Sequence, residues 1–266
     1  MPVRVAVHGV GKMGRELLQA LGKNPDFQVV GAVDIRAPAY PLPQGFETVL
    51  YSPHLDEVID KGKPQVLADF SNAEAARSLV PVATSKGVNL VIGTTGLTPH
   101  DLEEFDRLSH QAGVGVVAAP NFALGAVVMN YLAQLAARHF DYAEIVEMHH
   151  QEKLDAPSGT ALATARAMAE ARGKPFLHPA TRKENLPGTR GGELSGIAVH
   201  SLRLPGLMAH QQVIFGAPGQ TLSIRHDAIS RECFMPGILL AIRAVVGLKG
   251  LVYGLEKLLG LGGDQP

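Results

Sequence analysis

The stretch from Glu147 to Ala161, EMHHQEKLDAPSGTA, holds a dense group of side chains that could do chemistry. It contains two adjacent imidazoles, His149 and His150, and the ammonium of Lys153, followed by a turn and by Ser158-Gly159-Thr160. The apolar run before the histidines predicts a strand, and the last trio predicts the start of a helix. The unpaired N–H groups and positive dipole of a helix start favour carboxylate or phosphate. The stretch therefore predicts a pocket for a polyanion.

The two histidines cannot both serve one reacting atom. Neighbouring residues on a strand point to opposite faces, so His149 and His150 diverge unless the strand bulges. We expect one imidazole to reach the reacting centre and the other to bind or orient the ligand from the side. A histidine pair and a lysine also occur on ordinary surfaces. The combination of titratable groups with a turn and a helix start nevertheless favours a functional site.

A second motif lies near the N-terminus, where Gly9, Gly11 and Gly14 form G-x-G-x-x-G between a strand-like run (3–7) and a helical pattern that reaches Leu21. The first glycine permits a tight turn, the second lets a pyrophosphate approach the backbone, and the third allows close packing of helix on strand. The next predicted strand, residues 28–33, ends in Asp34. A carboxylate at that position can accept hydrogen bonds from an adenosine ribose, which completes the fingerprint of a dinucleotide site.

Two residues bear on the choice of cofactor. Asp34 favours the free 2′-hydroxyl of NADH, whereas Arg36 can pair with the 2′-phosphate of NADPH. We expect NADH and/or NADPH to serve, with a mild preference for NADH.

The rest of the N-terminal half alternates strands with helices. Strands are predicted at residues 65–69, 89–92 and 114–118, and residues 37–43 form a proline-rich loop. Ser71 with Glu74 predicts a capping box for a helix that ends at 86–87, and Thr98-Pro99 predicts the start of another. This alternation indicates a Rossmann-like, doubly wound parallel α/β sheet, whose ligands bind beyond the carboxyl ends of the strands. The predicted cofactor contacts at these ends, besides Asp34 and Arg36, are Gly9, Val10, Gly11, Lys12, Met13, Gly14, Gly93, Thr94, Thr95, Ala119, Pro120, Asn121 and Phe122.

The pattern changes after Phe122. A long apolar helix (124–140), the strand and helix of the opening stretch, and a Gly/Pro-rich loop (186–192) precede three strand-like runs at 197–202, 211–216 and 221–227. Strands without intervening helices predict a second, α+β domain with a mixed or open sheet, and a partner subunit would cover its open face. Apolar helices at 238–247 and 251–261 would return to the first domain. The predicted domains are residues 1–122 with 232–266, and residues 123–231.

Composition limits the class of protein. The chain has 266 residues, of which 46% are hydrophobic and 18% charged, and its formal net charge is −1. We therefore expect a folded cytoplasmic protein with no affinity for nucleic acid or membrane. Cys233 is the only cysteine, which excludes an internal disulfide and a cysteine-built metal site. We expect no metal, because adjacent histidines on a strand diverge.

Over nearly its whole length the chain resembles the dihydrodipicolinate reductase (4-hydroxy-tetrahydrodipicolinate reductase) family of lysine and diaminopimelate biosynthesis. The most specific match is E-x-H-H-x-x-K-x-D-A-P-S-G-T-A at residues 147–161. Further matches follow in order: GKMG (11–14), GTTG (93–96), APNF (119–122), HSLRLPG (200–206), AHQ (209–211) and IRHD (224–227). The last three resemble one branch of the family.

The resemblance implies a Rossmann domain that binds NAD(P)H and a second domain for substrate binding and homotetramer assembly. It implies a cyclic imine dicarboxylate as substrate, with loss of water and hydride addition to C4. Carried onto this chain, the catalytic residues are His149 and Lys153, either of which could be the general acid that protonates the product. The substrate-binding residues are His150, Gly159 and Thr160.

The departures from the family pattern leave these groups intact. The glycine loop is one residue shorter than in many members, Ala123 stands where serine is common, and Met208-Ala209 precede His210 in place of Gly-Asp or Gly-Glu. A nucleotide sensor without activity would be expected to have lost His149 or Lys153. Another dehydrogenase, such as one acting on aspartate or homoserine, would not be expected to carry residues 147–161 in this form.

Overall fold

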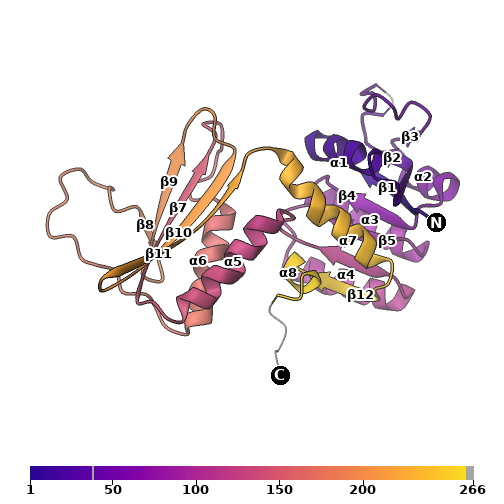
Figure 1. Cartoon of the computed structure of the whole chain (residues 1–266). Helices are drawn as coiled ribbons and strands as arrows, with labels where there is room; N and C mark the ends of the chain where they lie inside the picture. Colours follow the sequence, from indigo (N-terminus) through magenta and orange to yellow (C-terminus); the bar gives the residue numbers. More distant parts are fainter. Residues whose placement is uncertain (38, 262–266) are drawn as a thin grey trace. The chain divides into compact units, whose positions relative to one another are not determined.

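The computed structural model describes residues 1–37 and 39–261, so one residue of the predicted proline-rich loop and the last five of the predicted first domain lie outside the described residues. The chain forms two compact units (Figure 1). The first unit comprises residues 1–124 and 234–266, and the second comprises residues 125–233. None of the described helices is both long and apolar enough to cross a membrane.

The first unit is built on a seven-stranded sheet in the order β12-β6-β5-β4-β1-β2-β3. Every neighbouring pair of strands is parallel, which confirms the predicted doubly wound sheet. Its strands are β1 (Val3–His8), β2 (Phe27–Val33), β3 (Leu50–Ser52), β4 (Val66–Asp69), β5 (Asn89–Ile92), β6 (Gly115–Ala118) and β12 (Gly250–Tyr253). Because β4, β5 and β6 lie on one side of β1 and β2 lies on the other, the order reverses at β1, where such folds bind their ligands.

Helices flank this sheet (Figure 1). They are α1 (Lys12–Gly22), α2 (Leu55–Gly62), α3 (Ala73–Ser85), α4 (Pro99–Ala112), α7 (Met235–Val245) and α8 (Leu255–Leu258). The fully buried β4 and the largely buried β5 pack with α3 through residues such as Leu67, Leu79 and Leu90. Strands that are apolar on both faces are typical of parallel sheets covered by helices on each side.

The caps of two helices test the sequence predictions. Thr98 caps α4, as expected, and also forms a complete capping box with Asp101. The predicted Ser71 cap of α3 is wrong, because Asn72 caps that helix and accepts a hydrogen bond from the N–H of Ala75. The Ser71 hydroxyl instead donates to the buried Asp69 carboxylate at 2.6 Å. A hydrogen bond to an ionised carboxylate is stronger than one between neutral groups, so this contact directs the Ser71 side chain toward the end of β4.

The C-terminal segment also differs from prediction. Residues 251–261 were expected to form one helix, but β12 occupies 250–253 and only a single helical turn, α8, follows. Gly250 is the first residue of the strand and Gly254 follows its last, and their φ values of +85° and +93° are not compatible with a continuous helix. The strand pairs in parallel with β6, so its apolar residues extend the sheet. No element was predicted for residues 50–62, which form β3 and α2.

The second unit has a mixed five-stranded sheet in the order β11-β10-β7-β9-β8, which confirms the predicted α+β character. Only β7 and β9 are parallel among its described strands. The strands are β7 (Tyr142–His149), β8 (Gly192–Leu194), β9 (Ile197–Arg203), β10 (Ala209–Ala217) and β11 (Gln220–Ala228). They accompany α5 (Leu124–Ala137), α6 (Gly159–Arg172) and a short 3-10 turn, η1 (Arg231–Phe234).

The two faces of this sheet differ. One face packs against α5 and α6 and forms the core with Ile145, Val213 and Phe215 (Figure 1). Strand alternation sends the intervening side chains to the opposite side. We call this side the second face, and it carries Glu144, Val146, His200, Gln212 and Ile214. Val146 and Ile214 are neither buried nor fully exposed.

Candidate active site

The three glycines of the N-terminal motif occupy three different environments. Gly9 has φ +82°, and a Cβ there would lie 2.8 Å from the carbonyl oxygen of Phe70. A Cβ on Gly14 would lie 2.1 Å from the carbonyl oxygen of Gly9, so this residue lets α1 pack onto the loop. A Cβ on Gly11 would meet nothing within 4 Å. The loop therefore leaves open space at the position where a pyrophosphate would approach its backbone.

The carboxylate of Asp34 is fixed by four hydrogen bonds. It accepts from the N–H of Val10 at 2.8 Å, from the N–H of Arg36 at 3.0 Å, and from Nε and Nη2 of Arg36 at 2.8 and 2.9 Å. The Arg36 guanidinium holds the pKa of Asp34 at about 2, although burial acts in the opposite direction. Asp34 is thus ionised and ties the glycine loop to the end of β2.

A stack of side chains that the sequence did not predict lies beside Asp34. The guanidinium carbons of Arg36 and Arg15 lie 4.3 and 5.0 Å from the centroid of the Tyr40 ring. Arg15 also donates to the carbonyl of Pro41 at 2.7 Å. Such contacts are cation–π interactions. No motif marks Tyr40, because it lies in an irregular loop, and Arg15 has only a general helical pattern around it.

The other predicted cofactor segments lie at the same edge of the sheet. Asp69 at the end of β4 accepts from His8 at 2.6 Å and from the hydroxyl of Thr94 at 2.7 Å, which connects β1, β4 and the segment after β5. The segment 119–122 follows β6, and the N–H of Ala119 bonds to the carbonyl of Ile92 at 3.1 Å. The rings of Phe70 and Phe122 pack edge to face, with their centroids 6.1 Å apart. Gly93 and Thr95 flank Thr94, and Lys12 and Met13 open α1, so every predicted segment reaches this edge.

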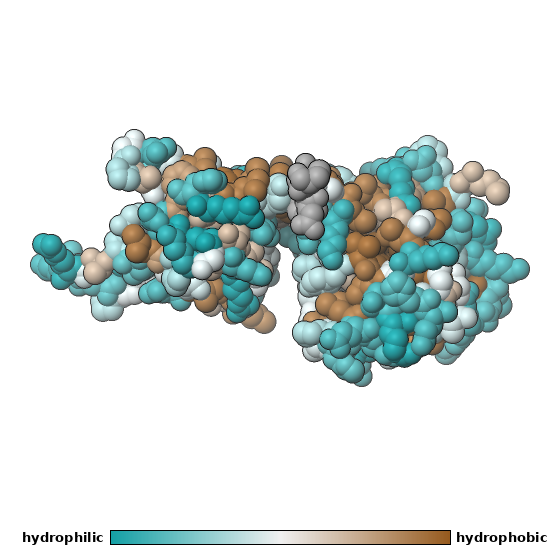
Figure 2. Space-filling model, turned by 90° about the horizontal axis from the view of Figure 1, so that it is seen from below, coloured by the Kyte–Doolittle hydropathy of each residue, from teal (hydrophilic) through white to brown (hydrophobic). Residues whose placement is uncertain are grey.

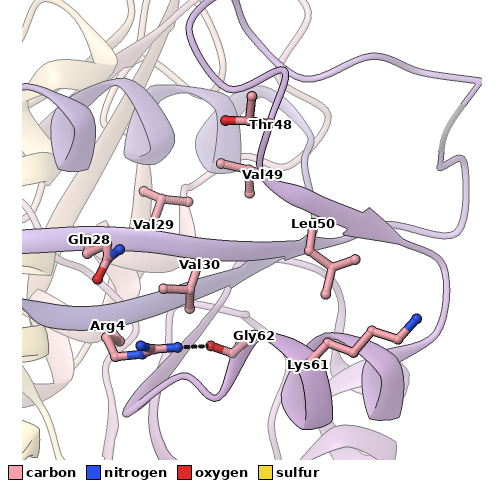
Figure 3. A pocket seen from close by; sticks show the side chains of 9 residues that line it. All are labelled: Arg4, Gln28, Val29, Val30, Thr48, Val49, Leu50, Lys61 and Gly62. Atoms are coloured by element: carbon pink, nitrogen blue, oxygen red, sulfur yellow. Dashed lines mark hydrogen bonds between the residues drawn. The ribbon is translucent and has the colours of Figure 1, made fainter.

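The first unit also has a hollow at the opposite end of its strands (Figure 3). It is lined by Arg4, Gln28, Val29, Val30, Thr48, Val49, Leu50, Lys61 and Gly62. Arg4 donates to the carbonyl oxygens of Gly62 and Lys63, so its charge is engaged by the protein itself. Ligands of parallel α/β sheets bind beyond the carboxyl ends of the strands, and this hollow lies beside the amino-terminal half of β2.

In the second unit the predicted strand and helix start are confirmed. His149 is the last residue of β7, and α6 begins at Gly159 with Ser158 as its N-cap. The Ser158 hydroxyl accepts from the N–H of Ala161 at 3.2 Å. Gly159 and Thr160 are exposed, and a Cβ on Gly159 would meet nothing within 4 Å. The first turn of α6 therefore presents its backbone to open space.

The two histidines lie in different environments. His149 turns inward, and its Nδ1 lies 2.5 Å from a carboxylate oxygen of Glu147. Burial lowers the pKa of His149, and the opposing effect of Glu147 does not restore it. His150 follows the strand and is exposed.

Lys153 lies in the loop between β7 and α6. Its N–H bonds to the carbonyl of His150 at 3.2 Å, and its ammonium donates to Asp155 at 2.7 Å. The charge of Lys153 also contributes to the lowered pKa of His149, after the larger effect of burial. His149, Lys153, Gly159 and Thr160 thus belong to one strand end, loop and helix start, which can bind an anion and transfer a proton.

Sequence reasoning missed the residue that joins these parts. Glu147 is fully buried and accepts from Arg203 through both carboxylate oxygens, at 2.7 and 2.9 Å. It also accepts from the N–H of Ser158 at 3.2 Å. Glu147 belongs to the motif, but only the partner Arg203, 56 residues away, shows what it does.

Comparison with known proteins gives the relatives of this chain. A 4-hydroxy-tetrahydrodipicolinate reductase of Dehalococcoides mccartyi (strain CBDB1) is 54% identical over 263 residues, covering 98% of this chain and 99% of the relative. The enzyme of the same name from Moorella thermoacetica (strain ATCC 39073 / JCM 9320) is 49% identical, with 97% and 98% covered. A dipicolinate-bound dihydrodipicolinate reductase from Paenisporosarcina sp. TG-14 is 40% identical, with a TM-score of 0.88 and coverage of 97% and 99%.

The fold extends to more distant enzymes. An amine dehydrogenase from Mycobacterium smegmatis has a TM-score of 0.67 at 17% identity, with 95% of each chain covered, which is a likeness of fold alone.

A Rossmann-like unit with an intact dinucleotide loop, and a second unit with a histidine and a lysine beside a helix start, are the features of an NAD(P)H-dependent oxidoreductase. Sequence models described as the N-terminus and C-terminus of dihydrodipicolinate reductase match residues 3–122 and 125–259. The chain belongs to the dihydrodipicolinate reductase family.

Proposed function

We propose that this protein reduces 4-hydroxy-tetrahydrodipicolinate to tetrahydrodipicolinate, with loss of water, in lysine and diaminopimelate biosynthesis. The observation that carries the proposal is the intact cluster of His149, Lys153 and the Gly159-Thr160 helix start, in a chain whose relatives carry that enzyme name. The first unit would bind the cofactor, and the second would bind the substrate.

The substrate has two carboxylates, and the second unit offers groups for both. The first N–H groups of α6, at Gly159 and Thr160, and the ammonium of Lys153 are suited to carboxylate oxygens. The exposed His150 can add a further hydrogen bond from the side. A relative with 40% identity is described as bound to dipicolinate, a planar ring with two carboxylates.

The chemistry requires a reductant and a proton donor. A hydride carrying two electrons leaves the nicotinamide and adds to C4 of the conjugated imine that forms when water is lost. The electron density that moves into the ring must then be protonated at carbon. His149 and Lys153 are the candidates for that general acid.

We assign the cofactor site to the glycine loop, Asp34 and Arg36, with the segments at 93–95 and 119–122. The ionised Asp34 can accept from the ribose hydroxyls of NADH, and its charge opposes a 2′-phosphate. Arg36 is paired with Asp34 and offers that phosphate a partially neutralised guanidinium. We therefore expect a mild preference for NADH, with NADPH also accepted.

We further propose a cytoplasmic homotetramer. The second face of the sheet in the second unit carries Val146 and Ile214 between polar residues, and a sheet face of this kind is well suited to cover by an identical subunit. Figure 2 shows hydrophobic residues at the surface, interspersed with hydrophilic ones.

The test is a coupled assay in which a dihydrodipicolinate synthase generates the substrate from pyruvate and aspartate semialdehyde. We expect rapid oxidation of NADH, and slower oxidation of NADPH, only when the synthase is present. Pyridine-2,6-dicarboxylate should compete with the substrate. If both cofactors bind but neither is oxidised, the protein is a nucleotide sensor; if neither binds, the assignment of the glycine loop is wrong.

A further inference from the structure

The buried carboxylate of Glu147 lies at the centre of a network that the reaction as proposed does not use. It has no exposed surface, and four groups donate to it: Nη1 and Nη2 of Arg203, Nδ1 of His149 and the N–H of Ser158. Two carboxylate oxygens offer about four lone pairs, so these bonds use the whole accepting capacity of the side chain. A carboxylate held in this way has one orientation.

Glu147 is ionised in this environment. Burial opposes its charge, but the hydrogen bonds from Arg203 and His149 act in the other direction, and the pKa of Glu147 lies below its ordinary value. Arg203 in turn is fixed by a second contact, from Nη2 to the carbonyl of Asp155 at 2.7 Å. The pair therefore joins β7 and β9 to the loop that carries Lys153.

An ionised carboxylate can only accept, so the His149 nitrogen that faces it must carry a proton. Nδ1 lies 2.5 Å from a carboxylate oxygen of Glu147, so the two groups are in direct hydrogen-bond contact. The other ring nitrogen, Nε2, lies on the edge of the ring away from Glu147. In a neutral imidazole with a proton on Nδ1, Nε2 has a lone pair and accepts.

We propose that Glu147, clamped by Arg203, is a positioning residue of the active site, which fixes His149 as the Nδ1-protonated tautomer and presents Nε2 as an acceptor. This inference rests on the proposed function in its assignment of His149 to the reaction. It deepens that assignment, because a neutral His149 with Nε2 unprotonated cannot donate from that atom. The proton that ends on the substrate then leaves Nζ of Lys153, which keeps the electron pair and is reprotonated from water.

The lowered pKa of His149 agrees with a neutral ring at neutral pH. Burial is its largest cause, and the charges of Lys153 and Arg203 act in the same direction. The Glu147 carboxylate acts in the opposite direction.

The first experiment uses the wild-type protein and does not depend on activity. Nitrogen-15 NMR of the histidine rings, with His149→Gln to assign the signal, should show one neutral tautomer at neutral pH, with the proton on Nδ1. A ring with its proton on Nε2, an even mixture of tautomers, or an imidazolium would overturn the proposal.

The second experiment compares Glu147→Gln with Glu144→Gln. Glu144 is a matched control, because it lies on the same strand and also pairs with an arginine and a histidine, Arg190 and His200, but on the second face. Glu147→Gln should lower kcat roughly a hundredfold, as expected when a histidine loses the carboxylate that sets its tautomer, and should leave KM within about threefold. Glu144→Gln should keep both constants within about twofold.

The outcomes separate this inference from the proposed function. An unchanged kcat in Glu147→Gln, or a raised KM alone, would contradict positioning. If Glu147→Gln does not fold, the NMR result on the wild type still decides. If the wild-type protein does not oxidise NADH with the substrate, the proposed function fails, whereas the tautomer of His149 remains measurable.

Discussion

In the loop that leads into α6, Lys153 carries the charge that we propose for substrate binding. The ammonium nitrogen of Lys153 lies 2.7 Å from a carboxylate oxygen of Asp155, and 22% of the Lys153 side chain is exposed. The ammonium is therefore held in place but remains accessible. A substrate carboxylate would offer it a second anionic partner. We therefore expect the charge at this position to affect substrate binding and proton transfer.

Lys153→Ala should abolish turnover, with kcat reduced by about a hundredfold or more, because a general acid contributes a factor of that size. NADH binding, followed by fluorescence titration, should be nearly unchanged. Lys183→Ala is the control, since Lys183 lies exposed in the loop before β8. Lost cofactor affinity with turnover retained would reverse the assignment of the two units.

At the adenosine end of the cofactor site, Asp34 has two tasks. It accepts from Val10 and from Arg36, so it orders the loop and restrains the guanidinium at the same time. We predict that Asp34→Ala weakens the binding of NADH about tenfold more than the binding of NADPH. The substitution removes an acceptor for the ribose hydroxyls and frees Arg36 to pair with a 2′-phosphate. Dissociation constants for both cofactors test this prediction. Equal losses of affinity would mean that Asp34 does not contact the ribose.

On the scale of elements, both predicted ligand sites use the N-terminus of a helix. At the first, α1 begins directly after Gly11, and at the second, α6 begins at Gly159. A Cβ would meet nothing within 4 Å at either glycine, whereas at Gly14 it would lie 2.1 Å from a carbonyl oxygen. Open space beside the first N–H groups of a helix is where an anion can bind.

Gly159→Ala should therefore keep the fold and NADH affinity while raising the substrate KM about tenfold, because its methyl group projects toward the bound carboxylate. Alanine is also the better helix former, so the unfolding midpoint should not fall. Gly14→Ala is the contrasting variant and should lose stability. An unchanged KM in Gly159→Ala would mean that the substrate does not approach this helix start.

On the scale of the whole molecule, the second face of the five-stranded sheet is the surface that the proposed homotetramer would cover. It combines the half-buried Val146 and Ile214 with Glu144, which is paired to Arg190 and His200. Polar residues that are already paired within the chain can be covered without leaving an unpaired charge.

We expect Ile214→Glu to shift the protein to smaller species in light scattering at micromolar concentration, because a buried, unpaired carboxylate opposes association. Gln212→Glu would test the neighbouring position, and Lys183→Ala provides a control on an exposed loop. A wild-type protein that is monomeric under these conditions would contradict the proposed assembly.

Local sequence patterns were enough to determine the glycine motif, the strand ends that follow it and the start of α6, because caps, turns and hydrophobic periodicity depend on neighbours in the chain. The same patterns failed for residues 251–261, where pairing with β6 makes a strand from a segment that reads as a helix. They also misplaced the cap of α3, because the partner that takes the Ser71 hydroxyl, Asp69, is buried at a strand end.

Only the tertiary structure decided how the site residues are held. The parallel pairing of β7 with β9 places Arg203 beside Glu147, although 56 residues separate them. His149 and the N–H of Ser158 bond to the same carboxylate, and Arg203 also donates to the carbonyl of Asp155. The sequence supplied the chemical groups of this site, but their partners come from strand pairing across an intervening helix, which no local pattern encodes.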